Sequence, residues 1–137
     1  MLATDLLDDF IDEANEQLSD VDNQFLHIEQ TAPDVDVDLV NDLFRSFHSI
    51  KGAAGFMGFD TVNDLSSNLE TVLIEMRNGE ITPSAPIVDT MIKATDKLKG
   101  LIDNLAISNS IDVSDQINQL AAISAGRAAA PQGVATA

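Results

Sequence analysis

The residues best suited to chemistry in this sequence stand close together in the stretch FRSFHSIKGAAGFMGF, which covers residues 44–59. His48 and Lys51 are three positions apart there, and Gly52 follows the lysine directly. A histidine ring nitrogen can accept a phosphoryl group, and a lysine one helical turn further on can place a positive charge beside the phosphate oxygens. The chain has only two histidines and seven Lys and Arg residues, so this combination is conspicuous. It predicts a phosphoacceptor site on the surface of a helix.

Helical geometry predicts which residues share a face with His48. Each residue of an α-helix advances by about 100°, and four residues of this stretch fall within about 60° on either side of the histidine. They are Phe44, Lys51, Gly52 and Gly55. Each glycine costs about 1 kcal/mol of helix propensity, which calls for a structural reason. Access for an incoming protein is one such reason, and close packing of a neighbouring helix is another.

A nucleophilic imidazole also needs a partner that fixes its tautomer. One ring nitrogen must be unprotonated, and a carboxylate that accepts the hydrogen of the other nitrogen secures that state. The helix expected after residue 60 should lie beside His48 and present four polar residues on the corresponding flank. They are Asn63, Ser66, Ser67 and Glu70. Glu70 follows an inward-facing leucine, as His48 follows an inward-facing phenylalanine, so we expect Glu70 to be the partner; a register shift of one turn would select another of the four.

The remaining candidates concern docking and the second histidine. Four residues near the predicted site are candidates for a surface that contacts a partner protein. They are Phe44, Gly55, Phe56 and Met57. Core packing would explain the three apolar residues among them equally well. His27 has neither a lysine nor a glycine on its helical face, so we interpret it as a structural residue without chemistry.

Apolar residues recur at spacings of three and four along most of the chain, which predicts amphipathic helices packed in an antiparallel bundle. The first helix should begin after a Thr4 cap and continue to about Gln30. Its apolar stripe consists of Leu7, Phe10, Ile11, Ala14, Leu18, Val21, Phe25 and Ile28. The second should run from about Asp36 to Ala54. Its inward-facing residues are Val40, Leu43, Phe47, Ile50 and Ala54.

Two further helices complete the predicted bundle. The third should begin after a glycine-containing turn, with Asp60 as its cap, and end at Gly79. Its inward-facing residues are Val62, Leu65, Leu69, Val72 and Met76. Thr82 before Pro83 favours the start of the fourth helix, because proline has no amide hydrogen to leave unpaired there. The inward-facing residues of that helix are Ile87, Met91, Ala94, Leu98, Leu101, Ile102 and Leu105.

A shorter amphipathic segment should follow and pack against the end of the bundle. Its apolar residues are Ile117, Leu120, Ala121 and Ile123. From Gly126 the sequence is small, polar and unpatterned, which predicts a domain over residues 1–125 and a flexible tail or the start of a linker over 126–137. The predicted fold class is therefore all-α: an up-and-down antiparallel four-helix bundle with an additional C-terminal helix.

Composition narrows the classes of function. Without cysteine the chain has no disulfide, zinc thiolate site or cysteine nucleophile. A formal net charge of −16 opposes nucleic acid and anionic membranes as partners, because their phosphates would be repelled. The sequence contains no run of about 18 apolar residues and no signal-like N-terminus, so we expect a soluble, cytoplasmic protein without membrane insertion.

Nucleotide and metal sites find no support in the sequence. It contains no G-x-x-x-x-G-K loop and no G-x-G-x-x-G turn that could hold the phosphates of ATP. Neither histidine occurs in the Glu-x-x-His pairing that builds carboxylate metal sites in helical bundles. We therefore expect this chain to bind no metal and no cofactor itself, and a phosphoryl group for His48 to come from another domain or protein.

The stretch at residues 44–59 resembles the motif F-R-x-x-H-S-[IL]-K-G-x-[AS]-x-x-x-G-[FL] of histidine phosphotransfer (HPt) domains. FIDEANEQL in the first predicted helix and NLETVLIEMRNGEI in the third are similar to segments of the N-terminal phosphotransfer domains of the CheA family of chemotaxis kinases. The resemblance covers most of the chain. Ala53 departs from it, because the CheA-like motif often has glycine there; it is a small residue on an adjacent face, and we expect little functional effect.

The resemblance implies a four-helix bundle with an extra C-terminal helix and phosphorylation at His48. Lys51 and Gly52 match motif positions, and Glu70 matches the family's glutamate partner of the histidine. It also implies that the ATP-binding domain of a histidine kinase phosphorylates His48, and that an aspartate in the receiver domain of a CheY- or CheB-like response regulator then takes the group. ATP and magnesium would be used by these partners.

On this interpretation the chain is a substrate and carrier, not an enzyme by itself, and a fragment of a CheA-like kinase is favoured over a free-standing carrier. The alternative is a helical-bundle interaction module whose histidine is never phosphorylated.

Overall fold

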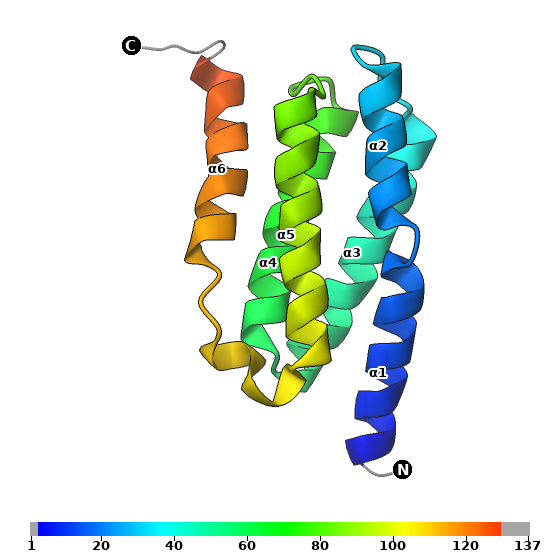
Figure 1. The fold of residues 1–137 in the computed structure, drawn as a ribbon, viewed down its shortest axis with the longest axis vertical. Coiled ribbons are helices and arrows are strands. Elements are labelled where there is room, and N and C mark those ends of the chain that lie inside the picture. The colour runs from blue at the N-terminus through cyan, green and yellow to red at the C-terminus, as the bar shows by residue number, and fades with distance from the viewer. Residues whose placement is uncertain (1–2, 130–137) are drawn as a thin grey trace.

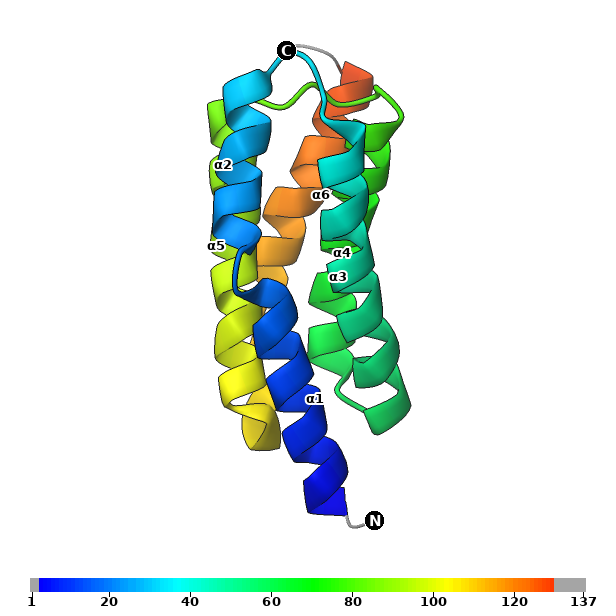
Figure 2. The same ribbon diagram turned by 90° about the vertical axis from the view of Figure 1, so that its right-hand side faces the viewer.

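The computed structural model describes residues 3–129, which form six α-helices, one 3-10 helix and no strand (Figure 1). The helices are α1 (Ala3–Leu18), α2 (Val21–Thr31), α3 (Val37–Met57), α4 (Asp60–Arg77), α5 (Ala85–Asp103), the 3-10 helix η1 (Leu105–Ser110) and α6 (Ser114–Ala129). Successive helices run up and down, with α2 continuing the direction of α1 (Figures 1 and 2). This confirms the predicted fold class, an up-and-down bundle with an additional C-terminal helix.

The first predicted helix is interrupted. Leu18 ends α1 and Val21 begins α2, and a turn at Ser19 and Asp20 bends the chain between them (Figure 2). The Ser19 hydroxyl donates to the carbonyl of Glu16 at 2.8 Å, a local bond that competes with helix continuation. Leu18 and Val21, the apolar residues on either side of the break, are both buried. The apolar spacing therefore continues across the break and does not reveal it. Thr4 lies within α1, not at its N-cap as predicted.

Helix α3 matches the prediction at its start and in its core but extends further. Asp36 is its N-cap and accepts a hydrogen bond from the Leu39 amide at 3.2 Å. The five predicted inward-facing residues are all buried. The helix ends at Gly58, which adopts the left-handed conformation with φ +83° and donates its N–H to the carbonyls of Ala54 and Gly55. Gly55 is therefore a helical residue and not part of the turn.

Helix α4 lies antiparallel to α3 and buries all five of its predicted core residues. Phe59, not Asp60, occupies the N-cap position. Asp60 lies in the first turn, where its negative charge interacts favourably with the positive end of the helix dipole. Gly79 has φ +79° just past the end of α4, as predicted for a C-terminal glycine. Because the α3–α4 connection is so short, the register of these two helices is tightly set.

The start of the next helix is shifted from the prediction. Helix α5 begins at Ala85 with Ser84 as N-cap and Pro86 in its first turn, so the proline that favours initiation is Pro86 and not Pro83. Six of the seven predicted inward-facing residues are buried; Ile87 is half-buried. Leu105 among them belongs to η1 and not to α5.

Helix α6 packs along the side of the bundle, against α4 and α5, and not against its end as predicted (Figure 1). Of its predicted apolar residues Leu120 is buried, Ile117 and Ile123 are half-buried, and Ala121 is exposed. The helix continues to Ala129, so the boundary predicted at residue 126 falls inside it. Residues 130–137 of the predicted tail lie outside the described residues, and the division into domain and linker stays a prediction.

Among residues 3–129, no helix is both long and apolar enough to cross a membrane.

Candidate functional site

The two helices that lie side by side after the Gly58 turn, α3 and α4, bring the predicted site residues together. The Nδ1 atom of His48 on α3 lies 3.2 Å from Oε2 of Glu70 on α4. The Nζ atom of Lys51 lies 3.1 Å from the other oxygen, Oε1, of the same carboxylate. Of the four polar residues expected on this flank of α4, it is therefore Glu70 that lies beside the histidine, as predicted.

Burial differs sharply among these three side chains. The Glu70 side chain is only 6% exposed, whereas that of His48 is 62% exposed. A buried carboxylate is costly unless its oxygens are paired, and here each oxygen has its own partner. The result is an anchored negative charge beneath an imidazole that remains open to a second protein.

The carboxylate also sets the chemistry of the ring. A carboxylate only accepts hydrogen bonds, so Nδ1 of His48 must carry the hydrogen in this contact. In the neutral ring the lone pair is then on Nε2, which has no hydrogen-bond partner among the described residues. An exposed nitrogen with a free lone pair can act as a nucleophile.

Phe44 lies one turn before His48 on α3 and stacks on the imidazole. The two ring centroids are 5.5 Å apart and the planes differ by 15°. The guanidinium carbon of Arg77, at the end of α4, lies 5.7 Å from the centroid of the Phe44 ring. Arg77 also donates from Nη1 to Oδ1 of Asn41 at 3.3 Å.

Arg77 and Asn41 were not predicted as site residues, although their spacing from Glu70 and His48 places them on the same helical faces. Arg77 follows Glu70 by seven residues, two turns along α4, and so shares its face. Asn41 precedes Phe44 by three residues and His48 by seven, which places it on the same face of α3.

The two glycines on the His48 face have different surroundings. A Cβ atom added at Gly52 would meet no atom within 4 Å, so this position faces open space. A Cβ atom at Gly55 would lie 3.0 Å from Nδ2 of Asn63 on α4, which itself donates to the carbonyl of Lys51 at 3.0 Å. Close helix packing, the second reason left open above, therefore accounts for Gly55, whereas no packing contact accounts for Gly52 and its role in access stays a prediction. The role of Gly55 in docking stays a prediction.

The apolar docking candidates near the end of α3 lie at a groove between α1 and α3. Phe56 is 85% exposed, and Met57 is half-buried. The groove has a volume of about 190 Å³. It is lined by Leu6, Asp9, Phe10, Glu13, Ala53, Phe56 and Met57. Phe56 is therefore not part of the core, and core packing does not explain its presence. Phe44, in contrast, is half-buried and packs against the core.

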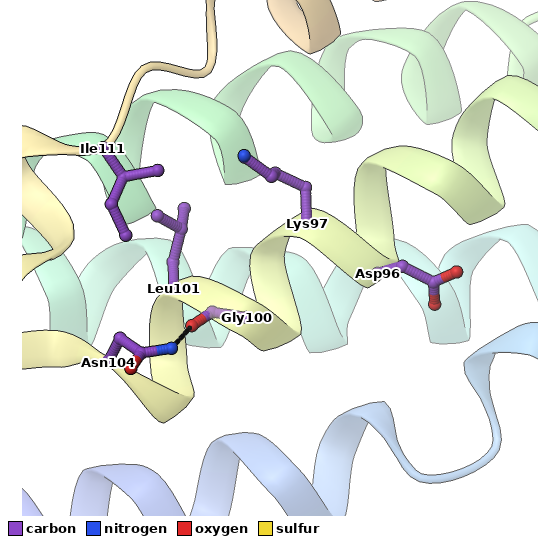
Figure 3. Close-up of a pocket in the computed structure, with 6 residues that line it drawn as sticks. All are labelled: Asp96, Lys97, Gly100, Leu101, Asn104 and Ile111. Carbon is purple, nitrogen blue, oxygen red and sulfur yellow. Dashed lines mark hydrogen bonds between the residues drawn. The ribbon is translucent and has the colours of Figure 1, made fainter.

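Other hollows lie away from this site. His27 faces solvent between α2 and α3, with Nε2 at 3.8 Å from Oδ2 of Asp36, and no lysine lies in its hollow. A second hollow, of about 240 Å³, lies along α5 and is drawn in Figure 3. Its lining residues are Asp96, Lys97, Gly100, Leu101, Asn104 and Ile111. None of them belongs to α3 or α4.

Comparison with known proteins places this geometry in a family. The model of the Hpt domain family matches residues 5–123. The chain belongs to the Hpt domain family. This Hpt domain is 32% identical over 124 residues to the chemotaxis protein CheA of Listeria monocytogenes. The match covers 89% of the chain but 20% of that relative, so the chain spans about a fifth of the relative's length.

Two solved structures share the fold of this Hpt domain. One is a solution structure of the histidine phosphotransfer domain of CheA, with a TM-score of 0.75 and 26% identity, covering 88% of this chain and 92% of that one. The other is the CheA phosphotransferase domain of Thermotoga maritima, with a TM-score of 0.70 and 30% identity, covering 77% of this chain and 99% of that one. The chain is thus a phosphotransfer domain of the kind found in CheA-like chemotaxis kinases.

Proposed function

We propose that His48 is the phosphoacceptor of this Hpt domain and carries the phosphoryl group on Nε2. The observation that carries the proposal is the contact between Nδ1 of His48 and the buried carboxylate of Glu70, on a ring that remains largely exposed. This arrangement leaves the lone pair on the outward nitrogen, where a phosphoryl donor can reach it.

The proposed donor is the ATP-binding domain of a histidine kinase. Nε2 attacks the γ-phosphorus of ATP, a nitrogen–phosphorus bond forms, and the bond to the bridging oxygen breaks so that ADP leaves. Nε2 carries no hydrogen before the attack, so no base has to remove one, and the hydrogen on Nδ1 stays with its bond to Glu70. The ring becomes positively charged in this step, and the adjacent carboxylate stabilises that charge.

The proposed acceptor is an aspartate in the receiver domain of a CheY- or CheB-like response regulator. A carboxylate oxygen of the aspartate attacks the phosphorus, the nitrogen–phosphorus bond breaks, and its electron pair returns to Nε2. Magnesium would be held by the receiver domain in this step and by the kinase domain in the first, so the Hpt domain needs no cofactor of its own. It presents phosphohistidine in a fixed geometry and catalyses neither step alone.

Two neighbours of His48 have proposed roles in transfer. Lys51 places its ammonium group one turn from the histidine. In the unphosphorylated domain this group pairs with Glu70, and after phosphorylation it can also neutralise a phosphate oxygen. Gly52 faces open space between His48 and Phe56, so the partner's backbone can approach the phosphorus closely. The apolar groove at Phe56 and Met57 continues this accessible face and is the proposed docking surface.

The proposed context is a longer cytoplasmic kinase of the CheA type. The chain spans about a fifth of the length of the CheA relative reported above. The catalytic ATP-binding domain would lie elsewhere in such a protein, and the present domain would be its phosphoacceptor.

The test is phosphorylation by an isolated kinase catalytic domain with radiolabelled ATP. Wild type should acquire an acid-labile, base-stable phosphate, whereas His48→Gln should acquire none and keep its helical circular dichroism. His27→Gln is the matched control, because it removes the other histidine and should label like wild type. Labelling that survives in His48→Gln would reject the site. A wild type that binds the kinase domain but is never labelled would favour an interaction module.

A further inference from the structure

Three side chains form a continuous stack beside the proposed phosphoacceptor. The imidazole of His48 lies against the ring of Phe44, with centroids 5.5 Å apart and planes 15° from parallel. The guanidinium of Arg77 lies over the same Phe44 ring, 5.7 Å from its centroid. Asn41 accepts a hydrogen bond from Arg77 and so fixes the guanidinium in turn. Each member of the stack is held by the next.

Neither contact follows from helix spacing alone. Residues four apart on a helix are neighbours, but near-parallel ring planes require that both side chains adopt matching rotamers. Arg77 comes from a different helix and reaches α3 from the last turn of α4. The same face of α4 therefore contacts His48 twice, directly through Glu70 and indirectly, two turns later, through Arg77 and Phe44.

We propose that Arg77 and Phe44 are positioning residues for His48, which hold the plane of the imidazole so that Nε2 faces the partner in one orientation. The proposal rests on the proposed function of His48. An imidazole that is 62% exposed has few core contacts to stop it rotating. The bond from Nδ1 to Glu70 fixes one atom of the ring but leaves the ring free to tilt about that bond. A flat neighbour on one face removes that freedom.

The orientation matters because transfer is an in-line displacement. Reaction rates fall when the attacking atom samples directions other than the one aligned with the bond that breaks. A cation over an aromatic face and a stacked aromatic pair each contribute modest stabilisation, so the expected effect on rate is graded and not all-or-none. Glu70 sets which nitrogen attacks, and the Arg77–Phe44 stack sets where that nitrogen points.

The chain offers a matched control for the charge of Arg77. Arg45 is the residue next to Phe44, is 69% exposed and pairs with Asp42 in the adjacent turn. Arg45→Ala and Arg77→Ala each remove one positive charge near the site, but only the second removes a group that touches Phe44. Arg77→Lys keeps the charge and loses the planar guanidinium that lies over the ring and bonds to Asn41.

The experiment compares these variants by two measurements. Nitrogen-15 NMR of the unphosphorylated domain reports the tautomer of the His48 ring and its mobility, and labelling by the kinase catalytic domain reports the rate. Arg77→Ala should increase ring mobility and slow labelling by about two- to fivefold, with Arg77→Lys in between. Arg45→Ala should leave ring mobility unchanged and the rate within about 1.5-fold of wild type.

Substitutions at Phe44 keep the test decisive if an Arg77 variant folds poorly. Phe44→Leu keeps an apolar side chain of similar reach but removes the flat ring, so it should slow labelling by about two- to tenfold. Phe44→Tyr keeps an aromatic ring and should be labelled at the wild-type rate. The proposal is overturned if Phe44→Leu and Arg77→Ala match Arg45→Ala in ring mobility and rate, or if Arg77→Lys restores both fully. Absence of labelling in wild type would instead reject the proposed function, and the NMR measurement would still decide whether the stack orders the ring.

Discussion

The α3–α4 pair and helix α6 represent two different ways of packing helices in one bundle. Polar side chains cross between α3 and α4 at four hydrogen-bonded contacts: Glu70 with His48, Glu70 with Lys51, Asn63 with the Lys51 carbonyl, and Arg77 with Asn41. Helix α6 meets its neighbours through apolar residues, among them the buried Leu120, and through a hydrogen bond from Ser124 to Glu75.

This difference separates orientation from stability. Hydrogen bonds between buried or half-buried polar groups fix directions, and each contributes little net stability because water is given up to make it. Apolar burial contributes stability without a preferred direction. The polar contacts between α3 and α4 should therefore govern how His48 reacts. The apolar contacts of α6, like the core residues of α3 and α4, should govern mainly the stability of the bundle. Substitutions in the two regions ought to separate rate from stability.

The largest stability effect is expected at Leu120. It is 1% exposed, and its replacement by alanine should lower the free energy of unfolding by about 2–5 kcal/mol, measured by urea denaturation. The labelling rate of His48 per folded molecule should not change. Ile107→Ala is the control, because Ile107 is 56% exposed, and it should change stability by no more than about 0.5 kcal/mol. A labelling defect in folded Leu120→Ala would show that α6 also shapes the site.

Apart from the loss of His48 itself, the largest effect on rate without loss of fold is expected at Glu70. Glu70→Gln keeps the shape of the side chain but removes the charge that secures the Nδ1–H tautomer. Labelling should slow by about 10- to 100-fold, by analogy with the loss of activity when the carboxylate partner of a metal-binding histidine is removed. The melting temperature should change little, because the charge that is removed is the buried one and the remaining Lys51 ammonium, whose side chain is 32% exposed, can be solvated. Asp64→Asn, an exposed acid on the same helix, should label normally. Equal rates for the two variants would contradict the role of Glu70.

The two glycines sharpen the comparison within α3 itself. Gly52→Ala should stabilise the domain by about 0.5–1 kcal/mol, since alanine is the better helix former and its Cβ meets nothing. Gly55→Ala should gain less stability or lose some, because its Cβ would lie 3.0 Å from the side-chain amide of Asn63. That amide would have to move, which would disturb its hydrogen bond to the Lys51 carbonyl. Thermal unfolding of both variants measures the contrast; equal stabilisation would mean that Asn63 moves aside freely.

A bulky residue at Gly52 probes access in place of packing. Gly52→Gln should fold as well as Gly52→Ala but slow transfer to a receiver domain by on the order of tenfold or more, because the side chain displaces the partner from its in-line approach. Parallel losses of melting temperature and transfer rate would argue that Gly52 serves the fold.

The sequence predicted the apolar packing of the helices better than the polar contacts between them. The spacing of three and four predicted the buried faces of α3 and α4, and the short turn at Gly58 tied their register closely enough to pair Glu70 with His48. The break at Ser19 was missed, because the apolar stripe continues across it. The place of α6 was wrong, because an amphipathic stripe indicates which face is buried but not what covers it.

The contacts of Arg77 were missed for a different reason. Its position on the face of Glu70 can be read from the sequence, but a guanidinium over an aromatic ring depends on rotamers of two long or flat side chains on separate helices. Such contacts become visible only when both backbones are placed. They are also the contacts that orient a reactive ring, so the finest determinants of the site are those that pattern alone does not reveal.

The smallest effect is expected at the start of α6. The side chain and backbone amide of Ser114 both donate to the Asp112 carboxylate, and these hydrogen bonds hold the pKa of Asp112 below its ordinary value of 3.8. A depressed carboxylate pKa stabilises the fold above the ordinary pKa, and that contribution is lost as the pH falls through the folded-state value. Asp112→Asn should therefore lower the melting temperature slightly at pH 7, and the difference from wild type should shrink as the pH falls below about 4.

Labelling of His48 should be the same in both proteins at neutral pH, since the hydrogen bonds of Asp112 go to Ser114 and not to the α3–α4 pair. A melting-temperature difference that stayed constant down to strongly acidic pH would mean that the asparagine acts through helix capping and not through charge. A change in labelling would break the separation between the two regions, because it would make the anchoring of α6 part of how the imidazole is held.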